Sequence, residues 1–176
     1  MSAKKVLFLV TCMVMLVTNV CFAWTRVQLN DNLGAGSFQG QYDYLISQTD
    51  NGQRFYKMSE LQHISNDGTV DIYGALNPVD KTNVIEYFCN QAGFVSGIVI
   101  TSSVPETIMF QGTVLMELAS EDSEAENYDT IYKLIKYSID NNCACGYHSY
   151  RTNRYYDIRT VSSYGIYMTK ITAGIK

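Results

Sequence analysis

Proline and histidine are scarce in this chain of 176 residues, which contains two of each. No stretch rich in proline, or in glycine and serine, divides the chain, and it contains no internal repeat. The sequence therefore predicts one domain rather than several domains joined by linkers. The two histidines, His63 and His148, also limit the zinc sites and histidine-dependent active sites that the chain can form.

Motifs for nucleotide binding, serine hydrolysis and calcium binding are incomplete. The stretch GAGSFQG at residues 34–40 has Gln39 where a dinucleotide fingerprint needs a glycine, and no Lys-Ser/Thr pair follows it as in a Walker loop. GFVSG at residues 93–97 has its serine one place late for a nucleophile elbow. The acidic residues 121–126 lack the spacing of an EF-hand loop. We expect residues 30–40 to form a surface loop.

The first 23 residues have the three parts of a secretory signal peptide. Lys4 and Lys5 precede an apolar segment at residues 6–17, and Cys21 and Ala23 are small residues at the −3 and −1 positions of a cut. The apolar segment is shorter than the roughly 20 residues that span a bilayer, which disfavours an uncleaved anchor. We therefore expect residues 1–23 to be removed and residues 24–176 to form the mature domain.

The export prediction places the mature protein outside the cytoplasm, in the periplasm or secreted. No N-x-S/T sequon follows residue 23, and together with the short lysine leader this favours a bacterial source. Intact-mass measurement of the exported protein tests the expected start at Trp24.

Charge is distributed unevenly along the mature chain. Residues 24–142 hold six Lys/Arg and sixteen Asp/Glu, a net charge of −10, whereas residues 143–176 hold five and one, a net charge of +4. The overall acidity argues against general nucleic-acid binding, because phosphates must be neutralised by cations. The basic tail is expected either to pair with the acidic part of the same domain or to form a local patch.

The hydrophobic pattern predicts strands broken by two amphipathic helices. Connections are short and the strands occur in runs, so we expect an α+β fold, with a mainly antiparallel sheet of roughly six to seven strands and both helices on one face. The last three strands are expected to form a meander. The expected helices are 84–92 and 127–141. The expected strands are a short one at 24–29, followed by 42–47, 54–58, 69–73, 94–101, 110–118, 143–150, 155–163 and 165–173.

Three cysteines follow the leader: Cys89, Cys143 and Cys145. Cys143 and Cys145 are one residue too close for a zinc knuckle, and strand alternation turns His148 to the other face. In an oxidising compartment we expect Cys89 to form a disulfide with, or to pack against, Cys143 or Cys145. The alternatives are a structural zinc protein, and a hydrolase that uses Cys145 or Cys89 with His148.

Tyrosine is the unusual component of the composition, with 14 residues. Tyrosine and arginine are enriched at binding hot spots, and both suit a sugar or an anionic polymer, although tyrosine is also a favoured strand residue. We expect an exposed contact site at Tyr150, Arg151, Arg154 and Tyr155, and little loss of stability when the two arginines become alanine.

These observations together favour a small exported domain that binds a partner in the cell envelope, a protein or a polysaccharide, rather than an enzyme. The sequence predicts no cofactor, no metal, no nucleic-acid partner, and no membrane association after the leader is cleaved.

Overall fold

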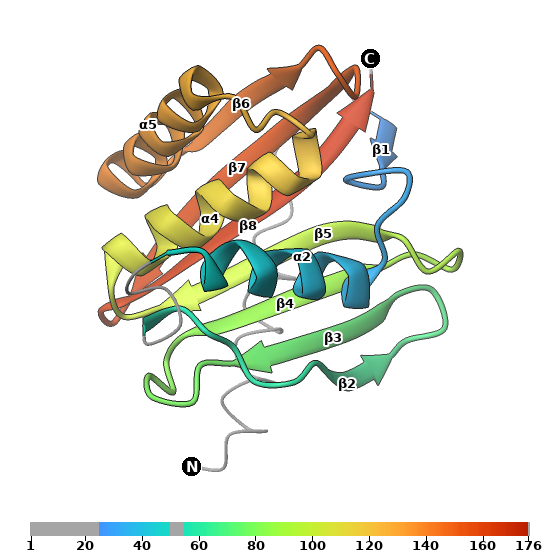
Figure 1. Ribbon diagram of the computed structural model, residues 1–176, viewed down its shortest axis with the longest axis horizontal. Coiled ribbons are helices and arrows are strands. Elements are labelled where there is room, and N and C mark those ends of the chain that lie inside the picture. Colours follow the sequence, from blue (N-terminus) through green and yellow to red (C-terminus); the bar gives the residue numbers. More distant parts are fainter. Residues whose placement is uncertain (1–24, 50–54, 176) are drawn as a thin grey trace.

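The computed structural model describes residues 25–49 and 55–175. It contains an antiparallel sheet of eight strands with three helices on one of its faces (Figure 1). The α+β prediction, with a mainly antiparallel sheet and a C-terminal meander, is confirmed. The predicted signal peptide and Asp50–Asn51–Gly52 of a predicted turn lie outside the described residues.

Two meanders build the sheet, whose strands are joined in the order β2-β3-β4-β5-β8-β7-β6. The first consists of β2 (Gln62–Asn66), β3 (Asp71–Leu76), β4 (Val84–Cys89) and β5 (Val95–Ser102). The second consists of β6 (Ala144–Ser149), β7 (Arg154–Ser163) and β8 (Ile166–Ile175). β8 returns to the middle and pairs with β5, while the short β1 (Thr25–Val27) pairs with the end of β8.

Three helices cover one face of this sheet (Figure 1). α2 (Ala35–Ser47) packs over β4, α4 (Pro105–Ser120) over β5 and β8, and α5 (Ala125–Asn141) over β6 and β7. α4 and α5 also connect the two meanders, so they carry the chain from β5 to the far edge of the sheet. None of the helices in the described parts of the chain is long and apolar enough to cross a membrane.

Two central segments have the opposite secondary structure from the prediction. Residues 84–89 form strand β4 rather than a helix, and nearly all of its side chains are buried, so no polar face marked the strand. Residues 110–118 belong to helix α4, which is enclosed by the sheet, α2 and α5 and therefore lacks a clear amphipathic stripe. Pro105, at the first turn of α4, was the helix-start signal in the sequence.

The stretch predicted as a loop and a strand, residues 35–47, is helix α2. Its buried residues Ala35, Phe38, Tyr42 and Ile46 recur at helical spacing, but glycine, serine and glutamine between them hid the pattern. Residues 55–58 do not form the predicted strand: Phe55 is helical, Tyr56 is in a turn, residues 57–58 have no regular secondary structure, and Arg54 lies outside the described residues.

From α5 onward the structure agrees with the prediction. α5 ends at Asn141, and Asn142 takes the left-handed conformation that terminates it. The three tail strands form the predicted meander. Tyr164 and Gly165 both have positive φ, as a two-residue hairpin turn between β7 and β8 requires. Gly93 also has positive φ, although it closes the β4–β5 hairpin rather than a helix.

Candidate functional site

The two faces of the sheet differ in chemistry. On the covered face the register aligns Ile98 with Ile171 and Ile158, and all three are fully buried below the helices. On the other face, here called the open face, it aligns Lys170 with Arg159 on one side and with Val99 on the other. Because side chains alternate along a strand, Asp157 and Arg159 of β7 and Lys170 of β8 gather on the face without helices.

A hollow of about 370 Å³ lies on the open face near the end of the sheet where β1 joins. Arg26 of β1 and Lys170 and Thr172 of β8 line it, together with Phe88 and Ser96 from the β4–β5 hairpin. Gly97 pairs with Thr172 across the strands, and because glycine has no side chain it leaves room for the hollow beside Thr172. The hollow thus combines two cations with a hydroxyl-bearing wall and one aromatic ring.

Positive charge is crowded around this hollow. Burial lowers the pKa of Lys170, and the charges of Arg26 and Arg159 lower it further, whereas Asp157 acts in the opposite direction. Burial raises the pKa of Asp157, and the three cations partly offset that effect. Three cations therefore face one half-buried carboxylate, and an added anion would relieve their mutual repulsion.

Aromatic rings continue the open face beyond the cations. Arg26 and Tyr155 flank Gly174 in the ladder, and Tyr155 pairs with His148. The His148 and Tyr155 rings stack with centroids 4.3 Å apart, and Tyr150 meets His148 edge-on at 4.6 Å. Next to Asp157 stands Gly146, where an added Cβ would meet open space.

The four residues of the predicted contact site point in different directions. Tyr155 lies on the open face and Tyr150 is 89 % exposed at the turn. The expectation that Arg154 is exposed is wrong: only 7 % of it is accessible, because it pairs with Asp31 in the loop after β1. Arg151 points toward the junction of α4 and α5, where it pairs with Glu124 at 3.0 Å. Two of the five cations of residues 143–176 thus form ion pairs within the domain.

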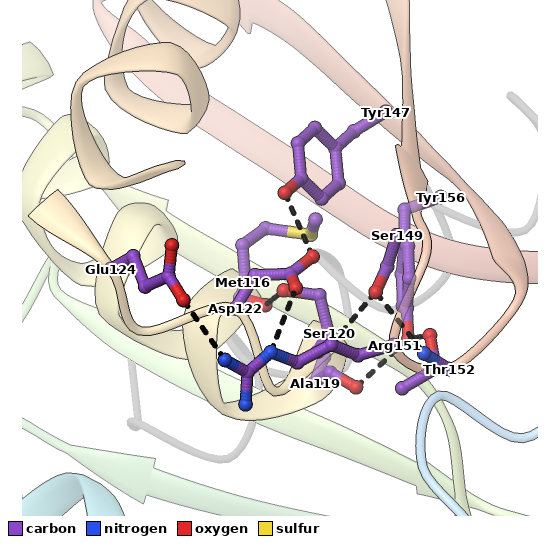
Figure 2. Close-up of polar contacts among 10 residues, drawn as sticks. All are labelled: Met116, Ala119, Ser120, Asp122, Glu124, Tyr147, Ser149, Arg151, Thr152 and Tyr156. Carbon is purple, nitrogen blue, oxygen red and sulfur yellow. Dashed lines mark hydrogen bonds and ion pairs between the residues drawn. The ribbon is translucent and has the colours of Figure 1, made fainter. Parts of the chain in front are cut away.

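Figure 2 shows the polar cluster in which Arg151 takes part. The hydroxyl of Tyr147 donates to the buried Asp122 at 2.8 Å, and Arg151 approaches the same carboxylate at 3.8 Å. The Ser149 hydroxyl donates to the Ser120 carbonyl, and the Tyr156 hydroxyl lies 2.8 Å from the carbonyls of Leu29 and Ala119. These contacts tie the end of α4 to the β6–β7 hairpin, which indicates a structural role.

The structure separates Cys89 from the other two cysteines and contradicts the predicted pairing. Cys89 is 2 % exposed at the end of β4, whereas Cys145 lies in β6. Four strand-to-strand steps separate β4 from β6, or about 19 Å at ordinary strand spacing. A disulfide or a direct packing contact between them is excluded at that separation. All three residues are free thiols.

His148 and Cys145 face opposite sides of the sheet, as strand alternation predicted. Cys145 pairs with the buried Ile158 on the covered face, and His148 pairs with Tyr155 on the open face. Burial raises the pKa of both the Cys89 and Cys145 thiols, and this disfavours the reactive thiolate. Among residues 25–49 and 55–175, no three histidine, cysteine or acidic side chains are grouped to hold a metal. The geometry therefore lends no support to the hydrolase or the zinc alternative.

Glu117 is a carboxyl group that the sequence reasoning missed. It lies in α4 among apolar residues, and burial raises its pKa to about 7. Its charge acts on the hydroxyls of Tyr128 in α5 and Tyr147 in β6, which places it between these elements. A single acid within the apolar run 107–119 was the available signal. Glu117 lies on a helix of the covered face, away from the hollow.

Glu117→Gln is expected to stabilise the protein above neutral pH. Because the folded pKa exceeds the unfolded one, the wild-type free energy of unfolding falls as pH rises from about 4.5 to 7, and the amide removes this loss. After discounting for partial exposure, we expect a gain of the order of 1 kcal/mol at pH 8 and little change at pH 4. Urea unfolding at several pH values measures it.

The matched control for that experiment is Glu106→Gln, the same change at an exposed position of the same helix. An equal gain in both variants would show that overall negative charge, rather than the buried site, is responsible.

The sequence shows the excess of cations in residues 143–176, but it does not show which of these cations come together in space. Arg159 and Lys170 are the tail cations that meet Arg26, and only strand pairing brings Arg26 to them across the length of the chain. Comparison of this chain with protein-family models, curated proteins and solved structures finds no match.

Proposed function

We propose that this protein is an exported, non-catalytic binding module whose open face takes an anionic polysaccharide of the cell envelope. One observation carries the proposal: Arg26 and Lys170 converge on a hollow of about 370 Å³, with Arg159 beside them and one carboxylate, Asp157, among the three cations. The rest of the mature chain is acidic, so this concentration of cations is local.

Cations crowded at a half-buried site favour an anionic ligand. The pKa of Lys170 is lowered first by burial of its ammonium and then by the charges of Arg26 and Arg159, so a charged lysine is costly at this position. A carboxylate or sulfate offsets that cost and forms charge-assisted hydrogen bonds, which are about twice as strong as neutral ones. Thr172 and Asn90 in the same hollow add side chains suited to the neutral hydroxyls of a sugar.

The aromatic rings favour a polysaccharide over a small ion. His148, Tyr150 and Tyr155 extend the open face past Gly174, in line with the cations. Sugar rings pack their apolar faces on aromatic side chains while their charged groups bind cations, and a single small anion would use only the hollow. The predicted site residues Tyr150 and Tyr155 remain in this proposal, and Arg26 and Lys170 take the place of Arg151 and Arg154.

The experiment compares binding of the protein to polygalacturonate with binding to neutral dextran. At low salt, Arg26→Gln and Lys170→Gln are each expected to weaken polygalacturonate binding by roughly 10- to 150-fold, because each removes a charge-assisted hydrogen bond of about 1.5–3 kcal/mol. Added salt should weaken wild-type binding in the same way, since the contact is electrostatic. Calorimetry or affinity electrophoresis gives the constants.

Arg151→Gln is the matched control, because it removes an equal charge from an exposed, ion-paired arginine outside the hollow. It should bind like the wild type. Equal wild-type affinity for dextran and polygalacturonate, or an equal loss in all three variants, would overturn the proposal.

A further inference from the structure

The segment Cys143-Ala144-Cys145 brings two thiols together at the edge of the sheet. β6 is the last strand of the sheet, so on one side it has no neighbouring strand within the described parts of the chain. Cys143 precedes β6 and is partly exposed, whereas Cys145 lies within β6 and is buried. The two side chains are hydrogen-bonding neighbours, and this contact contributes to the raised pKa of Cys145.

Cys143 lies just outside the ladder between β6 and β7, and the contacts of Ser138 explain why. The Ser138 hydroxyl of α5 donates to the Cys143 carbonyl at 2.6 Å and accepts from the Thr160 amide of β7 at 2.8 Å. This hydroxyl therefore stands between β7 and Cys143, where a direct ladder hydrogen bond would otherwise form. Asn142, immediately before, has a positive φ of 50°. Cys143 precedes β6, so the spacing of about 6.5–7 Å between alternate residues of a strand is not imposed on it.

We propose that Cys143 and Cys145 form a thiol–disulfide exchange site, which closes to a disulfide by reaction with a disulfide-bearing thiol compound or protein. Cys89, about 19 Å away across the sheet, takes no part. The short loop between the sulfurs adds little chain-entropy stabilisation, and Cys143 is partly exposed, so the disulfide is easily reduced again.

The exchange proceeds in two balanced steps. Cys143 loses its proton, and its thiolate attacks one sulfur of the external disulfide, forming a mixed disulfide and releasing the first thiolate. The Cys145 thiol then loses its proton and attacks the Cys143 sulfur, which displaces the second thiolate. Two protein thiols are oxidised, one external disulfide is reduced to two thiols, and the two protons end on the released thiolates.

The test equilibrates the purified full chain in glutathione buffers of graded composition, followed by acid quenching, alkylation and peptide mapping. As oxidised glutathione increases, the peptide containing Cys143 and Cys145 is expected to become two hydrogens lighter and to resist alkylation. Cys89→Ala should close at the same glutathione ratio as the wild type. A pair that stays reduced in every buffer, or a disulfide that includes Cys89 or joins two chains, would overturn the proposal.

Single variants test the order of the two steps. Cys145→Ser should accumulate a glutathione adduct on Cys143, because the resolving thiol is missing. Cys143→Ser should form almost no adduct, because Cys145 is buried. Equal adducts in both variants, measured with melting transitions like that of the wild type, would contradict the assignment of Cys143 as the attacking residue.

Discussion

Replacement of Ile135 by alanine is expected to lower the free energy of unfolding by about 2–5 kcal/mol, the range for isoleucine truncation in a core that relaxes only partly. Ile135 is fully buried in α5, where this helix meets α4 and the sheet. α4 carries Gly112 at this contact, which lets the two helices approach closely. Denaturant unfolding measures the change, and Tyr137→Ala, at a position 57 % exposed on the same helix, should cost far less.

A second substitution tests whether the loss comes from that contact. A Cβ added at Gly112 would lie 3.0 Å from Cδ1 of Ile135 and 3.5 Å from Cδ1 of Ile100. In the wild type this crowding offsets the helix-propensity gain of about 1 kcal/mol for Gly112→Ala. In the Ile135→Ala background the nearer atom is absent, so Gly112→Ala should stabilise the protein more. Strict additivity of the two effects would contradict this account of the packing.

Arg154→Ala is expected to lower the free energy of unfolding by about 1.5–3 kcal/mol, the range for hydrogen bonds to charged groups. The arginine is buried at the start of β7, and its guanidinium donates to Asp31 in the loop between β1 and α2. Its removal deletes both the ion pair and the packing of the side-chain stem. Thermal or denaturant unfolding at neutral pH gives the magnitude.

Arg151→Ala is the matched control for Arg154, since both arginines belong to the same hairpin and both form ion pairs. The Arg151 side chain is 54 % exposed, so its loss should cost about 0–1 kcal/mol. The Arg154 hydrogen bond holds the pKa of Asp31 below its usual value, so the pair stabilises the fold above the unfolded pKa of Asp31 and less as pH falls. Equal losses in the two variants at neutral pH would contradict the assigned roles.

Local sequence was most informative where an element is amphipathic or a turn has strong chemistry. α5 has one apolar stripe and a charged outer face, so the helical period of its apolar residues can be recognised in the sequence. The tail strands could be predicted because their side chains alternate between buried and outward-facing positions. The turn at Tyr164-Gly165 could be predicted from its residue types, and both residues have the positive φ of a tight turn. These signals suffice for the fold class, since runs of strands with short connections admit few other arrangements.

The two misassigned elements, β4 and α4, bury most of their side chains. Such a segment carries no clear period that distinguishes a strand from a helix. The two elements differ in length, with six residues in β4 and sixteen in α4. Length, together with Pro105 at the first turn of α4, is the better guide to which of them is the helix. The predicted pairing of Cys89 failed for the same reason: it assumed a helix above the sheet, while the residue lies in a strand within it.

The sequence by itself determined the α+β class, the cation excess of the tail, and the opposite orientations of Cys145 and His148. These follow from composition and from periodicity along the chain, which are local properties. The tertiary structure decided which cations remain on the surface. Arg154 is buried against Asp31, whereas Lys170 and Arg159 meet Arg26 because β1 pairs with β8. Strand pairing between residues about 150 positions apart depends on the packing of the whole sheet, and no local pattern encodes it.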